Sequence, residues 1–143
     1  MDGDELLTIG ELAEATGVAA SALRYWEELG LLPVPVRVSG HRRYPPSAAD
    51  DVGQILVLQE SGFTLRDIRA VFTAWSSDPA GWRALAEHKL AELDERIARA
   101  QAARDAVAHA LACRYRTPRD CPTGAGIVRA RLRGSSLRDA HGH

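Results

Sequence analysis

Side chains suited to phosphate groups gather in two short stretches of this 143-residue chain. The first is Arg24-Tyr25-Trp26-Glu27, and the second is Gly40-His41-Arg42-Arg43-Tyr44. Arginine donates several N–H groups in a geometry that matches phosphate oxygens, and aromatic side chains with polar tips can donate beside it. We interpret both stretches as parts of one DNA-binding segment, in which the donors of the second stretch contact the phosphates. The alternative is that Arg24 and Arg42 are ordinary solvated arginines.

Two cysteines, Cys113 and Cys121, flank a seven-residue loop that contains three arginines. Two thiolates that close a short loop suit a soft monovalent ion such as Cu(I) or Ag(I), which needs only two sulfur ligands. Zinc prefers four ligands, and the chain adds only His88 or His109, so a divalent site is less favoured. Activated thiols beside arginines also suit oxidation to a disulfide. The third alternative is an inert pair, with Cys113 a small apolar residue at a helix end.

The composition excludes several classes of protein. With 45% hydrophobic and 26% charged residues, the chain resembles a globular protein. No apolar run approaches the ~20 residues that span a bilayer, and the acidic start, Met1 to Glu5, is unlike a secretory signal. We therefore expect a cytoplasmic protein without a membrane partner. No glycine-rich phosphate loop, nucleophile elbow or paired-histidine motif supports an enzyme.

The charge distribution limits how the chain could bind DNA. The formal net charge is −1, and residues 1–75 contain six Arg and no Lys against eleven acidic residues. General electrostatic attraction to phosphate is therefore absent from this half. Binding there requires a few clustered arginines that face the DNA, with the carboxylates turned elsewhere.

Local signals predict two short helices joined by a tight turn. Thr8 and Glu11 form a capping-box pattern that begins the first helix, and Gly17 ends it. Residues 19–29 favour a second helix, which ends at Gly30. Two helices in this arrangement can lay the second one in a DNA major groove.

The following residues predict a β-hairpin wing and two more helices. Residues 34–38 alternate in polarity and lead to a turn at Gly40. Ser47 or a neighbour caps a helix that ends at Gly62, and Thr64 begins another. We assign a structural role in the core, and no function, to Leu29, Leu31, Leu32, Phe63, Leu65 and Ile68.

A long helix is predicted over residues 79–112. Within it, mostly apolar residues recur at alternating spacings of four and three, interrupted by one arginine, and we call this stripe the predicted dimer seam. Its residues are Ala86, Leu90, Leu93, Ile97, Ala100, Arg104, Val107 and Leu111. A lone helix would leave this stripe in water, and the chain offers no second long helix to cover it. We therefore predict a homodimer joined through a coiled coil, parallel or antiparallel, with the antiparallel form preferred.

The remaining segments are assigned by composition and position. Residues 113–122 form the cysteine loop, a candidate effector site. Residues 123–143, which end in His141-Gly142-His143, are expected to be a mobile tail. Trp82 at the head of the long helix could close an effector pocket, but we favour its packing against the first domain.

The order of these parts resembles a MerR-type transcription regulator. The matching pieces are Thr8-Ile9-Gly10-Glu11-Leu12-Ala13, Thr16-Gly17-Val18, Leu23-Arg24-Tyr25-Trp26-Glu27, Gly30-Leu31-Leu32, Gly40-His41-Arg42-Arg43-Tyr44 and Gly62-Phe63-Thr64-Leu65-Arg66-Asp67-Ile68. The resemblance implies a mainly α fold, with a winged helix-turn-helix DNA-binding domain over 6–75 followed by a coiled-coil dimerisation helix. The cysteine loop resembles the metal-binding loop of copper- and zinc-responsive relatives.

The resemblance also implies a function and a set of DNA contacts. A dimer would bind promoter DNA between the promoter elements and switch transcription by distorting this DNA. The distortion would affect RNA polymerase indirectly. Arg24 and Trp26 would touch phosphate and Ser21 would face base edges, although Trp26 and His41 depart from the tyrosine usual there. The full expected set is Ser21, Arg24, Tyr25, Trp26, Arg37, His41, Arg42, Arg43 and Tyr44.

Two alternatives remain open. One of Tyr25 and Trp26 must face the core while the other faces DNA, and we expect Tyr25 to face inward. The first domain could also bind a protein instead of DNA, as an interaction adaptor that the coiled coil only dimerises. An adaptor would be indifferent to salt and to the loss of Arg24 or Arg42, whereas binding to phosphates would not be.

Overall fold

A computed structural model describes residues 5–141, and its secondary structure is mainly helical. The chain divides into two compact units, with the boundary between Ala86 and Glu87, and each unit is considered by itself. None of the described helices has both the length and the apolar character needed to cross a membrane. The predicted fold class is confirmed.

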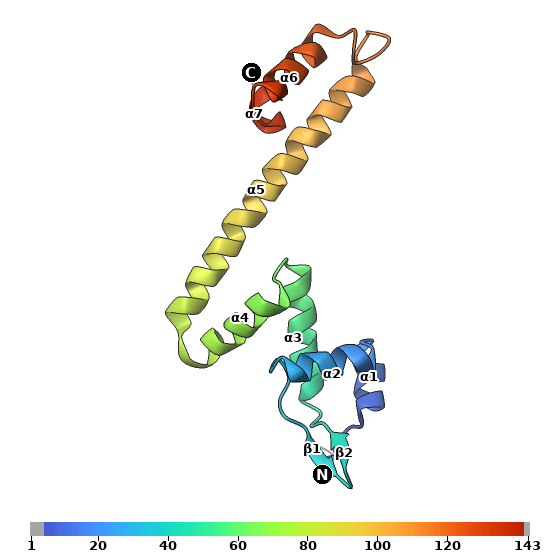
Figure 1. Ribbon diagram of the computed structural model, residues 1–143, viewed down its shortest axis with the longest axis vertical. Coiled ribbons are helices and arrows are strands. Elements are labelled where there is room, and N and C mark those ends of the chain that lie inside the picture. The colour runs from blue at the N-terminus through green and yellow to red at the C-terminus, as the bar shows by residue number, and fades with distance from the viewer. Residues whose placement is uncertain (1–4, 142–143) are drawn as a thin grey trace. The chain divides into compact units, whose positions relative to one another are not determined.

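The first unit begins with the predicted helix-turn-helix (Figure 1). Helix α1 spans Ile9–Thr16, and helix α2 spans Ala20–Glu28. The Glu11 backbone N–H donates to the Thr8 hydroxyl at 3.0 Å, and the Thr8 N–H donates to the Glu11 carboxylate at 2.9 Å. Gly17 ends α1 with φ 74°, a left-handed conformation that glycine adopts without steric cost. The capping box and the glycine turn are therefore both confirmed.

The wing is a two-stranded antiparallel hairpin. Strand β1, Val36–Val38, pairs with strand β2, His41–Arg43, so that Arg37 lies opposite Arg42. Ser39 and Gly40 in the turn have φ values of 51° and 81°. Two consecutive positive φ values match the twist of a tight hairpin.

Two further helices complete the first unit. Helix α3 spans Ala48–Glu60, and helix α4 spans Leu65–Ser77 with a capping box between Thr64 and Asp67. Ser47 occupies the position before α3, but its side chain makes no capping hydrogen bond. The core of the unit comprises Leu12, Leu23, Trp26, Leu31, Leu32, Tyr44, Ala48, Val52, Ile55, Leu58, Phe63, Ile68 and Val71, with Leu29 and Leu65 packed against it.

Helix α5 spans Pro79–Ala112 and matches the predicted range. Trp82 and Leu85 in its first turns pack against the core of the first unit. The Trp82 ring also meets the Trp75 ring edge-on, with centroids 5.4 Å apart. The preferred packing role of Trp82 is therefore confirmed.

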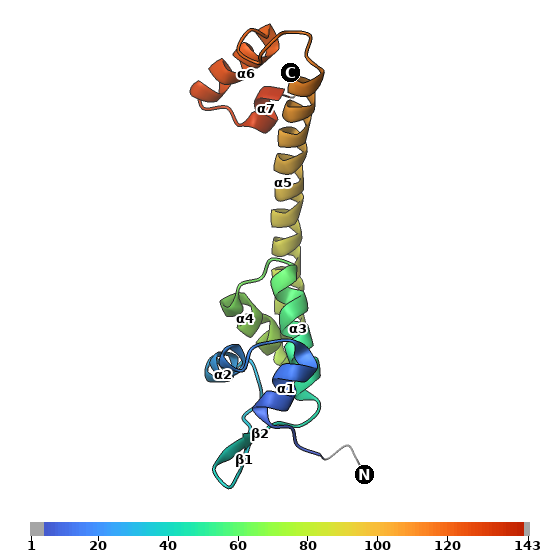
Figure 2. The same cartoon turned by 90° about the vertical axis from the view of Figure 1, so that its right-hand side faces the viewer.

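Two helices lie in the segment over 123–143 that was expected to be a mobile tail. Helix α6 spans Pro122–Leu132 and helix α7 spans Leu137–His141, and the chain turns back after α5 so that α7 lies beside that helix (Figures 1 and 2). Arg138 Nη1 donates to Glu95 Oε2 on α5 at 3.0 Å. Proline in the first turn has a φ suited to a helix start, which offsets the weak helix propensity of the glycines that follow. Residues 142–143 of the predicted tail lie outside the described residues.

The predicted dimer seam of α5 is largely uncovered within one chain. Leu90 is 60% exposed, Ile97 65%, Val107 61% and Leu111 84%. Ala102, which does not belong to the seam, is the buried residue of α5. The apolar stripe thus lies where a second helix could cover it, and the coiled-coil homodimer stays a prediction.

Candidate nucleic-acid interface and cysteine cluster

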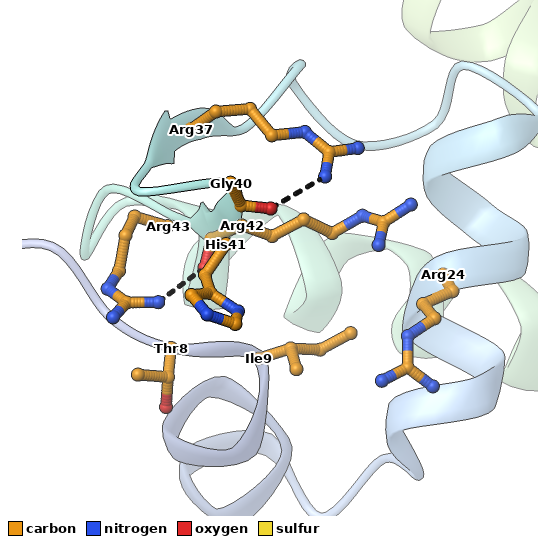
Figure 3. Close-up of a pocket in the computed structure, with 8 residues that line it drawn as sticks. All are labelled: Thr8, Ile9, Arg24, Arg37, Gly40, His41, Arg42 and Arg43. Atoms are coloured by element: carbon orange, nitrogen blue, oxygen red, sulfur yellow. Dashed lines mark hydrogen bonds between the residues drawn. The ribbon is translucent and has the colours of Figure 1, made fainter.

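A cleft between the helix-turn-helix and the wing gathers the predicted cations of the first unit (Figure 3). We call it the cationic cleft. Its volume is about 400 Å³, and it is lined by Thr8, Ile9, Arg24, Arg37, Gly40, His41, Arg42 and Arg43. Helix α2 supplies Arg24 and the wing supplies the other four cationic or titratable side chains. The fold therefore concentrates positive charge in a unit that is acidic overall, as DNA binding requires.

Arg24 lies on the exposed face of α2, together with Ser21 and Tyr25. Within the part of the chain that the structure describes, no hydrogen bond or ion pair engages the Arg24 guanidinium. Its donors are free for an external oxygen. A planar guanidinium can donate two parallel N–H bonds to one phosphate.

Arg42 and Tyr44 both bind one carboxylate of α2. Arg42 Nε donates to Glu27 Oε2 at 2.9 Å, and the Tyr44 hydroxyl donates to the same oxygen at 3.0 Å. Burial and the Glu27 carboxylate raise the pKa of Tyr44 to about 12. The ring of Tyr44 lies fully buried in the core. Glu27 therefore fixes the wing against the helix that carries Arg24, and we call this arrangement the Glu27 clamp.

The other wing arginines are held along the hairpin. Arg37 Nη1 donates to the Gly40 carbonyl at 3.2 Å, and Arg43 Nη1 donates to the Arg42 carbonyl at 3.0 Å. His41 at the turn is exposed. Each of these three side chains keeps N–H donors that the two hydrogen bonds above do not use, so the wing offers several donors at the cationic cleft.

The structure corrects the expected roles of three aromatic residues. Trp26 is only 5% exposed and packs in the core, whereas Tyr25 is 52% exposed. Leu23 and Trp26 lie three residues apart and so share the inward face of α2. Trp26 cannot contact phosphate, and Tyr25 takes the outward position. Tyr44 is fully buried and does not grip phosphate either.

Glu27 is a positioning residue that the sequence did not predict. A signal was present, because Glu27 follows Arg24 by three residues and so lies near it on the helix surface. Its partners lie 15 and 17 residues away in sequence. Pairing across that separation depends on how the wing folds onto α2, which local patterns do not specify.

A second group of reactive side chains lies wholly in the second unit. The potential ligand atoms of His109, Cys113 and Cys121 all lie within 4.8 Å of one another, and we call these residues the cysteine cluster. Helix α5 presents His109, Cys113 follows its C-terminus, and Cys121 is the residue before α6. Both cysteines are free thiols. The loop between them returns the chain so that the predicted pair does come together.

Cys121 has the environment of a metal ligand or a reactive thiol. His109 Nε2 lies 3.5 Å from its sulfur. The His109 imidazole and the backbone N–H of Gly124 lower the pKa of Cys121 to about 6. The thiolate, which is the form that binds metals, therefore prevails at neutral pH. A side chain at Gly124 would meet the Pro118 carbonyl at 2.7 Å, so glycine permits this close approach.

The donor set of the cluster fits a thiophilic metal ion. Two thiolates and an imidazole are ligands that zinc and related soft or borderline ions accept. Of the two histidines considered from the sequence, His109 belongs to the cluster, whereas His88 lies 3.0 Å from Glu92 on another part of α5. From the sequence, His109 was considered only as a weak additional ligand. Its spacing of four residues from Cys113 could have indicated that the two side chains lie on one helix face.

Family models and curated relatives both match this chain. The family model described as MerR HTH family regulatory protein matches residues 7–75, and the model described as MerR, DNA binding matches residues 50–110. A mercuric resistance operon regulatory protein from Bacillus cereus is 35% identical over 88 residues, covering 61% of this chain and 67% of the relative. The HTH-type transcriptional regulator HmrR from Rhizobium leguminosarum bv. viciae is 31% identical over 123 residues, covering 81% and 93%.

Solved structures share the fold. A crystal structure of HiNmlR, a MerR family regulator lacking the sensor domain and bound to promoter DNA, superposes with a TM-score of 0.59 at 23% identity, covering 92% of this chain and 98% of that one. Some curated relatives are longer, and the chain spans 32% of the nodulation protein NolA from Bradyrhizobium elkanii.

Proposed function

The chain belongs to the MerR family of helix-turn-helix regulatory proteins, and on this premise we propose that it binds promoter DNA as a homodimer and switches transcription by distorting the duplex. As a family member it is a DNA-binding transcription regulator and not an enzyme. The signal in this proposal is a soft metal ion or an oxidant at Cys113 and Cys121. The observation that carries the DNA contacts is the cationic cleft.

The cleft supports a two-part contact with the duplex. Helix α2 would enter the major groove with Ser21 toward base edges and Arg24 toward a phosphate, since all its exposed donors lie on one face. The wing would lie along the neighbouring phosphates, with Arg37, Arg42 and Arg43 as donors. The Glu27 clamp would keep these two contacts in register.

The exposed seam of α5 supports the homodimer. Apolar side chains such as Leu90 and Ile97 are more than half exposed in a single chain. Packing the same seam of a second copy against them removes this surface from water, which favours association. Two copies would then present two α2 helices to two half-sites of one operator.

The cysteine cluster supports the signal. Cys113 and Cys121 supply the two sulfur ligands that a soft monovalent ion such as Cu(I) requires. A curated relative is named for regulation of a mercuric resistance operon. An oxidant that joined the two thiols would act on the same residues. Either signal can change transcription only if it favours one conformation of the dimer over another. A signal that binds both conformations with equal affinity leaves their populations unchanged.

The experiment measures binding of DNA selected from a random-sequence pool by fluorescence anisotropy at several salt concentrations. We expect Arg24→Ala and Arg42→Ala each to weaken DNA binding about tenfold. Each should also reduce the slope of log affinity against log salt concentration by about one, the contribution of one phosphate contact. Arg96→Ala removes the same charge from an exposed position on α5 and serves as the matched control. Binding that ignored salt and both cleft substitutions would instead support the protein-interaction adaptor.

The signal is tested on protein purified without oxygen. Elemental analysis and thiol titration establish what the cysteines hold, and DNA binding is then compared with Cu(I), zinc and an oxidant present. We expect at least one of the three to change DNA binding, and the change to vanish in Cys121→Ser. If all three leave DNA binding unchanged, the cysteines have no sensing role.

A further inference from the structure

His109 occupies a position that the proposed two-sulfur site does not use. It lies in the last turn of α5, four residues before Cys113, so its side chain emerges on the same face of the helix. Its Nε2 atom lies 3.5 Å from the Cys121 sulfur. Of the chain's five histidines, His109 is the one grouped with both thiols among the described residues.

The separations within the cluster match tetrahedral coordination. Zinc binds thiolate sulfur at about 2.3 Å and imidazole nitrogen at about 2.0–2.1 Å, so a tetrahedral angle between them puts the two donors about 3.6 Å apart. The observed separation of Cys121 Sγ and His109 Nε2 is 3.5 Å. Two thiolates on the same ion would lie about 3.8 Å apart. No pair of potential ligand atoms in the cluster exceeds 4.8 Å, so closure needs at most about an ångström of movement.

We propose that His109 is the third ligand of the cysteine site, and that the site takes a tetrahedral thiophilic divalent ion of the zinc class with one coordination position left open. This inference rests on the proposed sensing function, and it assigns a three-ligand divalent ion in place of the two-coordinate monovalent ion. A two-coordinate monovalent ion needs no imidazole, whereas zinc accepts imidazole and thiolate together. Two thiolates also balance the charge of a divalent ion.

Such an ion would join two helices of the second unit. His109 lies in the last turn of α5 and Cys113 directly follows that helix, while Cys121 immediately precedes α6. The ion would tie the start of α6 to the end of α5 through three bonds. Binding energy would thereby stabilise one arrangement of the loop and α6, which is the kind of differential interaction that a switch requires.

The test compares His109→Ala with His88→Ala in the full chain. His88 also lies on α5 and is exposed, but it is outside the cluster, so its loss is the matched control. Zinc affinity is measured by competition with a chelator, Cu(I) affinity by the same method without oxygen, and Co(II) by visible absorption. We expect His109→Ala to weaken zinc binding about 100-fold and to abolish the intense absorption of tetrahedral Co(II), with Cu(I) affinity unchanged. We expect His88→Ala to change none of these.

A second variant separates loss of a ligand from loss of folding. His109→Cys keeps a donor at the position and is expected to retain tetrahedral Co(II) with stronger sulfur charge-transfer absorption. If His109→Ala binds zinc and Co(II) as tightly as the unaltered protein while Cys121→Ser does not, His109 is no ligand and metal sensing by the cysteines still stands. If the unaltered protein binds Cu(I) alone, the divalent assignment is overturned. If it binds none of the ions, the proposed metal response fails as well.

Discussion

The two units of this chain reach their folded state by different means. The first unit buries a cluster of thirteen residues, and its two capping boxes satisfy the starts of α1 and α4. Among its described residues, the second unit buries only Ala102 and Cys121, and it exposes large apolar side chains along α5 and α6. The first unit buries its large apolar side chains in its own core, whereas the second leaves much of its apolar surface uncovered within one chain.

This difference suits a regulator. A DNA contact gains precision from a rigid base, because the contacts proposed for Arg24 and the wing arginines require a fixed spacing to match phosphates. A signal, in contrast, can change only a part whose arrangement is conditional. In our proposal, a second copy and an ion at the cysteine cluster are the two conditions that set the arrangement of the second unit.

The largest effect is expected from Ile97→Asp in the exposed seam. A homodimer would bury this carboxylate in both copies without a partner, which costs several kcal/mol. We expect dimerisation to weaken roughly 1000-fold, while unfolding of the first unit is unchanged. Sedimentation equilibrium measures the first quantity, and the unfolding of α1 to α4 followed by tryptophan fluorescence measures the second.

Ala91→Asp is the control for that substitution. Ala91 is exposed on the same helix and does not belong to the seam, so the same charge there should leave the dimer intact. Equal loss of dimerisation in both variants, or a dimer that survives Ile97→Asp, would show that the seam is not the interface. The second unit would then owe its exposed apolar surface to some other partner.

Leu23→Ala tests the other side of the comparison. Leu23 is fully buried on the inner face of α2, so the substitution leaves a cavity beside Trp26. We expect the free energy of unfolding to fall by about 2–5 kcal/mol at every protein concentration. Chemical denaturation at several concentrations checks this. A loss that shrank as the protein was concentrated would mean that the first unit also depends on dimerisation.

Local signals predicted most of the first unit correctly. The capping box at Thr8, the turn at Gly17 and the wing turn at Gly40 each depend on residues a few positions apart, and all three are present. The same holds for α5, whose range was read from its periodicity. Where neighbours in sequence decide the conformation, sequence was sufficient.

The errors concern contacts between distant segments. Tyr25 and Trp26 are adjacent on a helix, and only the packing of Leu23 against the core decides which aromatic ring turns inward. Tyr44 was assigned to phosphate because its hydroxyl is a donor, yet that hydroxyl binds Glu27 across 17 residues. The composition after Pro122 suggested a tail, whereas residues 122–132 form α6.

A smaller effect is expected from Tyr44→Phe, which tests whether the contact between the wing and α2 stabilises the first unit. Loss of the hydroxyl removes one hydrogen bond to a carboxylate that Arg42 still binds, which costs about 1.5 kcal/mol. Because the folded protein raises the pKa of Tyr44 to about 12, its contribution is complete below the unfolded value of about 10 and is lost as pH rises through 12. Denaturation between pH 8 and pH 12 should therefore show the two proteins converging at high pH. Parallel curves would mean that the hydroxyl does not bind Glu27.

The smallest effect distinguishes a helix start that is capped from one that is not. Thr8 accepts from the Glu11 N–H at 3.0 Å, so Thr8→Ala leaves that donor without its partner and should lower the free energy of unfolding by about 1 kcal/mol. Ser47 precedes α3 in the same unit but makes no capping bond, so Ser47→Ala is the matched control and should change stability by less than about 0.5 kcal/mol. Urea denaturation resolves the two. If both variants lose the same stability, Ser47 also caps its helix in solution. If Thr8→Ala is as stable as the unaltered protein, the capping box does not stabilise the first unit.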